Sequence, residues 1–327
     1  MTTLFLATIG GHLAQLDELS HRLPADGATL WVTNANEQST SILADRDVHF
    51  VPYVGVRSVA GMLRCLPEAR RLMNSRRFTR AVSTGSGIAL GYLPYLASRG
   101  VQCHYIESAT RVHGPSLTGR FLQWVPGIRT YTQYPHWAGP RWRYGGSVFD
   151  GYEAVALTRE PTDQLRVVVT VGTATQYPLR RLFERLAPLL APDGRLRQVT
   201  GRTPSVLWQT GDTTIDDLPI HSGTVRPALP AAELTAALTA ADIVVSHAGT
   251  GSALAALDSG RFPILVARDP GHGEAGDNHQ LQLAGELSRR GLALHREVES
   301  LTTDDLLATL STAVQRTSTP PPFTLVP

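Results

Sequence analysis

The segment from Ala240 to Leu292 constrains the fold of this chain more than any other. A short apolar run, Ile243-Val-Val245, leads into the small-residue turn His247-Ala-Gly-Thr-Gly-Ser252, and a helical pattern follows before a second apolar run at 263–267. A strand that passes through a glycine turn into a helix points unpaired N–H groups and the positive end of the helix dipole at the turn, which suits a phosphate. Glycine turns also close ordinary βα units, so the turn alone does not identify a ligand.

A second polar motif follows the second apolar run. Asp277, Asn278, His279 and Gln280 stand in succession where another helix is expected to begin. Their side chains offer donors and acceptors suited to sugar hydroxyls. Alternatively, Asp277 or Asn278 caps the helix and Gln280 lies exposed on its first turn. A cap does not require all four residues, so we favour sugar contact.

The rest of the chain alternates between strand and helix patterns. This alternation predicts parallel sheets with helices on both faces, and 327 residues suffice for two such domains. Between 135 and 163 the periodicity fades and Pro, Gly, Trp and Arg cluster. We therefore expect one domain over 1–150 and a second over 151–327, the latter ending in a loosely ordered proline-rich tail.

Composition narrows the class of protein. The chain is 42% hydrophobic and 18% charged with a net charge of +2, which describes a globular protein and gives no argument for nucleic-acid binding. Its two cysteines, Cys65 and Cys103, lack metal-binding or redox spacing. The first residues lead directly into an apolar strand without signal-peptide features, and no apolar run is long enough to span a membrane. We expect a cytoplasmic protein.

The glycine turn and the 277–280 loop together resemble the C-terminal half of family 28 glycosyltransferases. Three N-terminal segments resemble the acceptor-side subunit of the two-subunit transferase of the dolichol pathway and its bacterial polysaccharide counterparts. They are Gly10-Gly-His12, Ser83-Thr-Gly85, and Tyr105 to Val112 with Ser116-Leu-Thr-Gly119. The chain thus looks like an acceptor half fused ahead of a catalytic half.

The resemblance implies the GT-B fold, with two Rossmann-like domains facing each other across a cleft. It implies an inverting transferase that uses a UDP-sugar and needs no metal and no other cofactor. The residues that would hold the donor are Gly172, Thr173, His247, Gly249, Thr250, Gly251, Ser252, Asp277, Asn278, His279 and Gln280.

One position departs from the family pattern. Relatives carry a glutamate on the helix after the glycine turn, where it accepts hydrogen bonds from the ribose hydroxyls, and this chain has Ala255 there. Asp258 and Glu274 are the nearby carboxylates that could take its place.

Two N-terminal residues are candidates for the base that deprotonates the acceptor. His12 follows two glycines at the end of the first strand, where ligands meet doubly wound sheets. It would act as base or as a polar clamp, or else only cap a helix. Glu107 would act as a base or orient His12, or else form an ion pair with Arg111 at i,i+4 spacing.

The segment from Arg57 to Arg80 predicts an attachment to a membrane. Seven arginines stand there against one acid, Glu68, with Leu and Met between them, which is typical of a basic amphipathic helix on an anionic surface. A solvated arginine face on a core-packed helix is the alternative. Trp124, Trp137 and Trp142 could lie at the same interface or in the core.

Three functions fit these patterns. The leading hypothesis is transfer from a UDP-sugar to a membrane-bound polyprenyl-pyrophosphate glycan at the inner face of the cell membrane. The second is a tailoring glycosyltransferase acting on a small soluble natural product. The third is a non-catalytic nucleotide-sugar sensor, which the loss of the ribose carboxylate at Ala255 favours.

Overall fold

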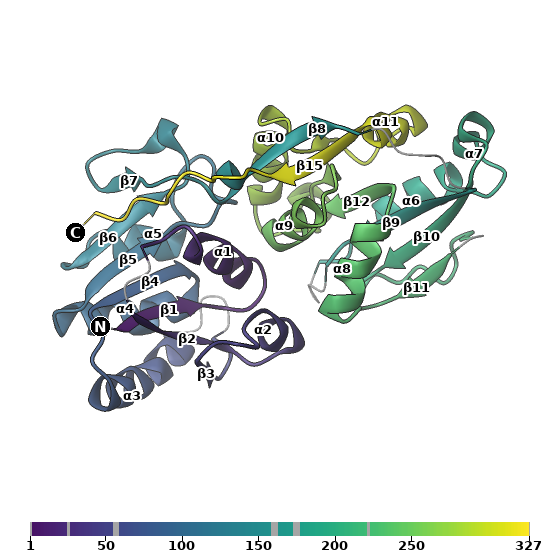
Figure 1. The fold of residues 1–327 in the computed structure, drawn as a ribbon. Helices are drawn as coiled ribbons and strands as arrows, with labels where there is room; N and C mark the ends of the chain where they lie inside the picture. The colour runs from purple at the N-terminus through teal and green to yellow at the C-terminus, as the bar shows by residue number, and fades with distance from the viewer. Residues whose placement is uncertain are drawn as a thin grey trace. The chain divides into compact units, whose positions relative to one another are not determined.

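The computed structural model describes residues 2–24, 27–54, 59–157, 163–172, 177–220 and 223–326. The chain divides into two compact units, one made of 1–150 with 320–327 and the other of 151–319 (Figure 1). In the described part of the chain, no helix combines the length and apolar character needed to cross a membrane.

The first unit is built on a seven-stranded parallel sheet in the order β3-β2-β1-β4-β5-β6-β7. Its strands are β1 (Thr2–Ala7), β2 (Ala28–Asn34), β3 (Val48–Val51), β4 (Arg80–Gly85), β5 (Gln102–Ile106), β6 (Ile128–Thr132) and β7 (Trp142–Tyr144). Its helices are α1 (Gly11–Ser20), α2 (Glu37–Ile42), α3 (Val59–Ser75), α4 (Gly87–Ser98) and α5 (Leu117–Leu122), with short 3-10 turns at Pro135–Trp137 and Val148–Gly151.

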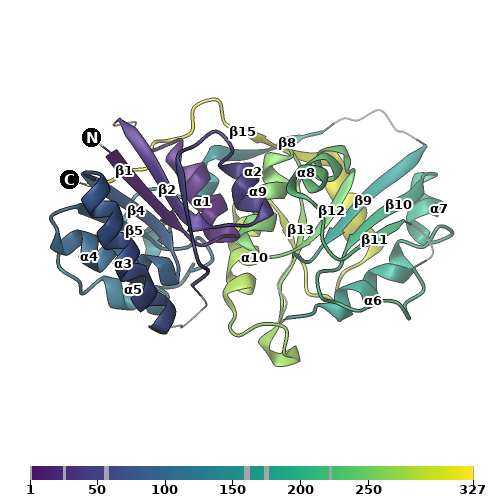
Figure 2. The same cartoon turned by 90° about the horizontal axis from the view of Figure 1, so that it is seen from below.

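Apolar side chains on both faces of this sheet explain the two layers of helices. One face packs against α3, α4 and α5 through a core that includes Leu4, Cys65, Tyr92 and Leu122 (Figure 2). Buried leucines of α1 meet β1 and β4 on the other side. Because strands buried on both faces need apolar residues throughout, the sequence shows continuous apolar runs rather than alternation.

The second unit repeats the same strand order. Its six-stranded parallel sheet runs β11-β10-β9-β12-β13-β14, and a separate antiparallel pair joins β8 to β15. The strands are β8 (Tyr152–Ala156), β9 (Gln164–Thr170), β10 (Thr203–Gln209), β11 (Thr224–Arg226), β12 (Ile243–His247), β13 (Ile264–Val266), β14 (Leu294–His295) and β15 (Thr312–Arg316). The helices are α6 (Arg180–Leu189), α7 (Arg195–Thr200), α8 (Ala231–Ala240), α9 (Thr250–Asp258), α10 (His279–Arg289) and α11 (Thr303–Ala308), with 3-10 turns at Pro270–His272 and Thr309–Ser311.

Both sheets therefore have the doubly wound order in which the strand sequence reverses beside the first strand. The reversal lies between β1 and β4 in the first unit and between β9 and β12 in the second. In such sheets ligands bind at the carboxyl ends of the strands at this switch point. The expected fold class, two Rossmann-like domains with parallel sheets, is confirmed.

The C-terminal tail corrects the expected organisation. Residues 320–327 belong to the first unit rather than the second, and the tail is not loosely held. Phe323 is buried, and its ring lies 6.1 Å from that of Tyr131 on β6. A Cβ on Gly145 would come within 2.7 Å of the Phe323 ring, so only glycine leaves room for it. Figure 1 shows this yellow segment leaving β15 and running along β7 and β6.

Backbone hydrogen bonds fix the same tail. Arg22 Nε donates to the Pro321 carbonyl at 2.8 Å, and the Phe323 amide donates to the Arg22 carbonyl at 3.1 Å. The Val326 amide donates to the Tyr131 hydroxyl at 3.0 Å. Proline runs suggest disorder, but one buried aromatic ring with paired backbone groups is enough to order a short tail.

Candidate functional sites

In the first unit, His12 lies at the switch point between β1 and β4. It follows β1 at the start of α1, and its Nδ1 lies 2.7 Å from the Thr84 carbonyl at the end of β4. A carbonyl can only accept, so Nδ1 carries the hydrogen and Nε2 is the basic nitrogen of the neutral ring. The Thr84 hydroxyl donates in return to the His12 carbonyl at 2.7 Å. Two strand ends thus fix both the tautomer and the direction of the imidazole.

Glycines on both sides make this placement possible. Gly10 has φ of 85° in the turn before α1, where other residues are strained. A Cβ on Gly85, whose φ is 107°, would lie 3.1 Å from His12 Cε1. The Gly10-Gly-His and Ser83-Thr-Gly motifs are therefore two halves of one arrangement.

Glu107 occupies a different environment at the end of β5. Its side chain is buried, and Oε1 accepts hydrogen bonds from the Tyr105 hydroxyl and the Ser108 amide, both at 3.1 Å. Oε2 accepts from the Ser116 amide at 2.9 Å and the Ser116 hydroxyl at 3.0 Å. Burial raises the pKa of the Glu107 carboxyl, and the hydrogen bonds from Ser116 and Ser108 oppose that rise.

This geometry gives Glu107 an organising role. The Ser116 hydroxyl it holds also accepts from the Gly119 amide at 3.1 Å and so caps α5. A Cβ on Gly119 would lie 2.3 Å from Glu107 Oε2, which explains the glycine of the Ser-Leu-Thr-Gly motif. The partners found for Glu107 are hydroxyls and backbone amides, whereas the alternative considered from i,i+4 spacing was an ion pair with Arg111.

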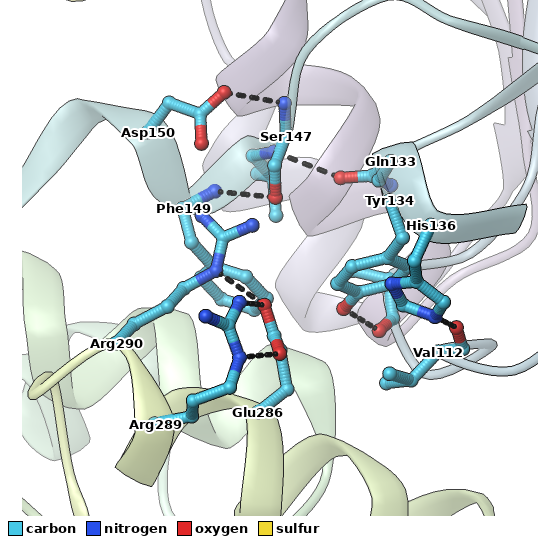
Figure 3. Close-up of polar contacts among 12 residues, drawn as sticks. Val112, Gln133, Tyr134, His136, Ser147, Phe149, Asp150, Glu286, Arg289 and Arg290 are labelled. Carbon is cyan, nitrogen blue, oxygen red and sulfur yellow. Dashed lines mark hydrogen bonds and ion pairs between the residues drawn. The ribbon is translucent and has the colours of Figure 1, made fainter. Parts of the chain in front are cut away.

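Two buried glutamines, which the sequence did not single out, hold the same loop. Gln15 Oε1 accepts from the Ala109 amide at 2.7 Å, and Gln133 Nε2 donates to the Glu107 carbonyl at 2.9 Å. Nearby, Tyr134 donates to the Ala109 carbonyl, and His136 Nε2 donates to the Val112 carbonyl at 2.6 Å (Figure 3). The position of Gln15 four residues after Gly11, on the inner face of the first helix, is the signal that could have revealed it.

The expected donor residues gather at the switch point of the second unit. His247 ends β12 and is buried between two glycine turns. A Cβ on Gly172 would lie 2.7 Å from its Cε1, and one on Gly249 would lie 2.4 Å from its Nε2. Gly249 is the N-cap of α9, which begins at Thr250 and continues through Gly251 and Ser252. Thr173 lies outside the described residues.

Two buried polar atoms lie unsatisfied at this turn. Among the described residues, neither His247 Nδ1 nor Thr250 Oγ1 has a hydrogen-bond partner, although both side chains are buried. Burial, and then the charge of Arg268, lower the pKa of His247 to about 3, so its ring is neutral at neutral pH. Buried polar groups are nearly always paired, so these two atoms are positioned to bond a ligand or a water.

Arg268 is a further residue that the sequence analysis missed. It follows β13, is buried, and donates to the Tyr177 carbonyl at 2.9 Å and the Val171 carbonyl at 2.7 Å. Burial lowers its pKa to about 10, an effect that Glu274 opposes. It ties the chain on both sides of 173–176 to the sheet. Arg268 could have been found from the sequence as an arginine just after an apolar strand, where the carboxyl edge of a parallel sheet is expected.

The 277–280 loop is arranged differently from a simple helix cap. Asn278 is the N-cap of α10, but its side chain makes no capping hydrogen bond. Asp277 pairs with the ring of His279 and accepts from its amide. Gln280 is buried rather than exposed, and its Oε1 accepts from the Arg268 amide at 3.1 Å. Gln280 thus links this loop to the arginine beside the glycine turns.

Both carboxylates suggested as substitutes for the missing glutamate already have ion-pair partners. Asp258 accepts from the Tyr152 hydroxyl at 2.5 Å and from Arg316 at 2.6 Å. Glu274 is buried and bound by Arg181 at 3.0 and 2.8 Å. Ala255 itself packs against the small core of β9, α8 and β12. Glu274 forms a buried ion pair, whereas the ion pair of Asp258 is exposed.

The arginine segment 57–80 is only partly a helix. Arg57 lies outside the described residues, α3 ends at Ser75, and Arg80 begins β4. The exposed face of α3 carries Leu63 and Leu66 beside Arg64, Arg70 and Arg71, while its other face is core.

A second exposed apolar surface lies on α5 and the turn that follows it, and the sequence analysis identified only its tryptophan. Leu117, Phe121 and Trp124 are 63%, 59% and 65% exposed at i, i+4, i+7 spacing. The Arg141 guanidinium lies 3.6 Å above the Trp124 ring. By contrast, Trp142 is buried and Trp137 packs on it, so these two tryptophans belong to the core.

Comparison with known proteins identifies the second unit. Residues 166–322 match the family model described as the glycosyltransferase family 28 C-terminal domain. A UDP-N-acetylglucosamine transferase subunit, ALG13 of Yarrowia lipolytica, is 41% identical over 58 residues, which are 18% of this chain and 28% of that protein. The chain thus spans little more than a quarter of the length of this curated relative.

Solved structures match nearly the whole chain at low identity. MurG of Acinetobacter baumannii is 17% identical with a TM-score of 0.57, over 94% of this chain and 90% of that one. The glycosyltransferase SnogD of Streptomyces nogalater is 17% identical with a TM-score of 0.58, over 95% and 91%. These likenesses show the fold, which is that of the GT-B glycosyltransferases.

Proposed function

We propose that this chain, whose residues 166–322 match the glycosyltransferase family 28 C-terminal domain, transfers a sugar from a UDP-sugar to a membrane-bound polyprenyl-pyrophosphate glycan. The pair of unsatisfied buried atoms beneath the glycine turn, His247 Nδ1 and Thr250 Oγ1, carries the donor part of the proposal. The backbone amides at the start of α9 would stabilise the charge that grows on the leaving diphosphate.

The acceptor side of the reaction needs a base. In the proposal, His12 accepts the proton of the attacking hydroxyl at Nε2, since its Nδ1–H is held by the Thr84 carbonyl. The hydroxyl oxygen then forms the new bond to the anomeric carbon as the bond to UDP breaks. Glu107 keeps the loop from 107 to 119 in place beside it.

Two exposed surfaces support an acceptor that is embedded in a membrane. Leu63 and Leu66 lie among arginines on α3, and Leu117, Phe121 and Trp124 line α5 with Arg141 on the indole ring. Apolar side chains flanked by cations suit shallow insertion into an anionic lipid surface. A cytoplasmic protein bound peripherally to the inner face of the cell membrane is therefore part of the proposal.

A transfer assay tests the function. The purified chain is incubated with a panel of UDP-sugars and vesicles that contain polyprenyl-pyrophosphate glycans, and the products are identified by mass spectrometry. We expect a lipid product longer by one sugar and an equivalent amount of UDP. Turnover confined to small soluble acceptors would favour a tailoring enzyme, and UDP binding without turnover on any acceptor would favour a sensor.

Gly249→Ala tests the donor site separately. Its Cβ would lie 2.4 Å from His247 Nε2, so the turn must open, and we expect UDP affinity to fall at least about tenfold in calorimetry. Gly285→Ala on α10 is the matched control, because a Cβ there meets nothing within 4 Å. Equal UDP affinity in both variants would remove the glycine turn from the donor site.

A further inference from the structure

His279 lies beside the glycine turns of the second unit. It begins α10, and the next residue, Gln280, accepts a hydrogen bond from the Arg268 amide at 3.1 Å. The Arg268 guanidinium donates at 2.7 Å to the carbonyl just before Gly172. A Cβ on Gly172 would in turn lie 2.7 Å from Cε1 of the His247 ring. A short series of contacts thus joins the start of α10 to the turn that precedes α9.

Asp277 fixes the tautomer of the His279 ring. Its carboxylate contacts Nδ1 and accepts a hydrogen bond from the His279 amide at 3.3 Å. A carboxylate only accepts, so Nδ1 carries a hydrogen and Nε2 is the nitrogen left to meet a ligand. The His279 side chain is 32% exposed, so it is accessible from solvent. A neutral ring would present a lone pair at Nε2, whereas a protonated ring donates a hydrogen bond there.

The charge of His279 acts on the glycine turn. Burial first, and then the charge of Arg268, lower the pKa of His247 to about 3, and the charge of His279 adds to this effect. The His247 ring is therefore neutral. The Arg268 guanidinium is occupied by two backbone carbonyls, and Glu274 has an ion-pair partner on α6. Histidine is the side chain whose charge ordinarily changes between about pH 5 and 8, so His279 can supply a positive charge at this edge of the sheet.

We propose that His279, in its protonated form and held by Asp277, donates a hydrogen bond from Nε2 to the terminal phosphate of UDP. The inference rests on the donor site of the proposed function, and it assigns one residue of the 277–280 loop to the phosphate rather than to the sugar hydroxyls.

This contact favours departure of the leaving group. As the bond between the anomeric carbon and the phosphate oxygen breaks, its electron pair stays on that oxygen and adds one negative charge to UDP. The imidazolium meets that charge without transferring its proton. It therefore stabilises the departing UDP more than the intact donor.

UDP and UMP are the probes, because UMP keeps the uridine and the first phosphate but lacks the terminal phosphate of UDP. Their affinities for the full chain are measured by calorimetry at about pH 6.5. We expect His279→Ala to weaken UDP binding about tenfold or more, the effect of losing a hydrogen bond between charged groups, and to leave UMP affinity within about twofold of the wild type.

His272→Ala is the matched control. His272 belongs to the 3-10 turn Pro270–His272 of the same loop and lies 3.9 Å from the Asp269 carboxylate, so it forms a second Asp–His pair before α10. We expect its replacement to leave both affinities unchanged. Thermal unfolding of each variant reports whether it folds.

The pH dependence separates charge from structure. The terminal phosphates of UDP and UMP both take up a proton near about pH 6, so the ratio of the two affinities cancels the ionisation of the ligands. In the wild type, the preference for UDP over UMP should fall at least about threefold between about pH 6 and pH 8.5, as the ring loses its proton. His279→Gln, which keeps a neutral N–H donor, should show a constant ratio.

Three results would overturn the inference while leaving the donor site in place. One is an equal loss of UDP and UMP affinity in His279→Ala, which would trace the loss to a displaced loop or to another part of the nucleotide. Another is equal UDP affinity in His279→Ala and the wild type. The third is a ratio that changes with pH equally in the wild type and His279→Gln. If neither nucleotide binds the wild type, the donor site of the proposed function is itself wrong and the inference falls with it.

Discussion

Among single residues, His12 is expected to dominate turnover. His12→Ala removes the ring whose Nδ1–H is fixed by Thr84, and we expect kcat to fall about a hundredfold or more, the usual range for a general base. UDP affinity should stay unchanged. His21→Ala, at the exposed C-cap of the same helix, is the control and should keep near-normal turnover. If His12→Ala remains active while Glu107→Gln folds but is inactive, the base is Glu107.

His247 makes stability depend on pH. Its pKa falls from 6.5 when unfolded to about 3 when folded, so the unfolded chain binds the proton first as the pH drops. The contribution of His247 to the free energy of unfolding is complete above pH 6.5 and is lost progressively as the pH falls from 6.5 to about 3. We expect the wild type to lose about 2 kcal/mol of unfolding free energy between pH 7.5 and 5 that His247→Asn does not lose, as measured in urea titrations. If the unfolding free energies of the wild type and His247→Asn change with pH in parallel, His247 is not buried as a neutral ring.

The sequence analysis identified site residues that stand beside a glycine turn, because the turn itself marks their position. His12, His247 and Gly249 lie at or shortly after strand ends, and the sheet order brings each to a switch point. It did not identify Arg268 or Gln15, whose roles depend on carbonyls and amides far along the chain. Nor did it identify the ion pairs of Asp258 with Arg316 and of Glu274 with Arg181, which leave no local pattern. Local geometry is readable from sequence, whereas long-range pairing of polar groups is not.

Among the helices, α5 is expected to contribute more to membrane attachment than the arginine segment first suggested. Arg71 and Arg76 are paired with Glu68 and Asp47, which reduces the charge they offer to lipid. Replacing Leu117, Phe121 and Trp124 together by serine should lower binding to anionic vesicles at least about tenfold in co-sedimentation, because exposed apolar area is removed. Leu281→Ser, an exposed leucine in the other unit, is the control. Unchanged vesicle binding in the triple variant would exclude α5 from the interface.

The strands β1, β2, β4, β5, β9, β10, β12 and β13 were predicted from the sequence because parallel strands covered on both faces are continuous apolar runs. The strands β3, β6, β11, β14 and β15 were not predicted. Neither were the short strands β7 and β8, which lie in the stretch rich in Pro, Gly, Trp and Arg where periodicity fades. Gln133 and Ser147 fix the chain there through the backbone amides of Val148 and Phe149. Such a segment takes its shape from tertiary hydrogen bonds, so its sequence shows only a loss of pattern.

For the molecule as a whole, the tail is a structural part of the first unit. Phe323→Ala should destabilise that unit by about 3–5 kcal/mol, the usual cost of deleting a buried phenyl ring. Hydrogen exchange should show faster opening of β6 and β7 and unchanged protection in β9 and β12. Val326→Ala, whose side chain is 37% exposed, should stay within about 0.5 kcal/mol of the wild type. Equal hydrogen exchange in Phe323→Ala and Val326→Ala would show that the Phe323 ring does not contribute to the stability of the first unit.

The return of this tail also sets the order of events during synthesis. Residues 320–326 are translated after 151–319, yet they complete a unit whose other residues, 1–150, are translated before 151–319. At about 5–20 residues per second, the 169 residues from 151 to 319 take roughly 10–30 s to translate. Throughout that interval the contact between Phe323 and Gly145 is missing from the first unit. A ribosome-stalled chain ending at 319 should therefore lose its first unit to protease faster than the released chain, and equal rates would mean that the first unit is closed without the tail.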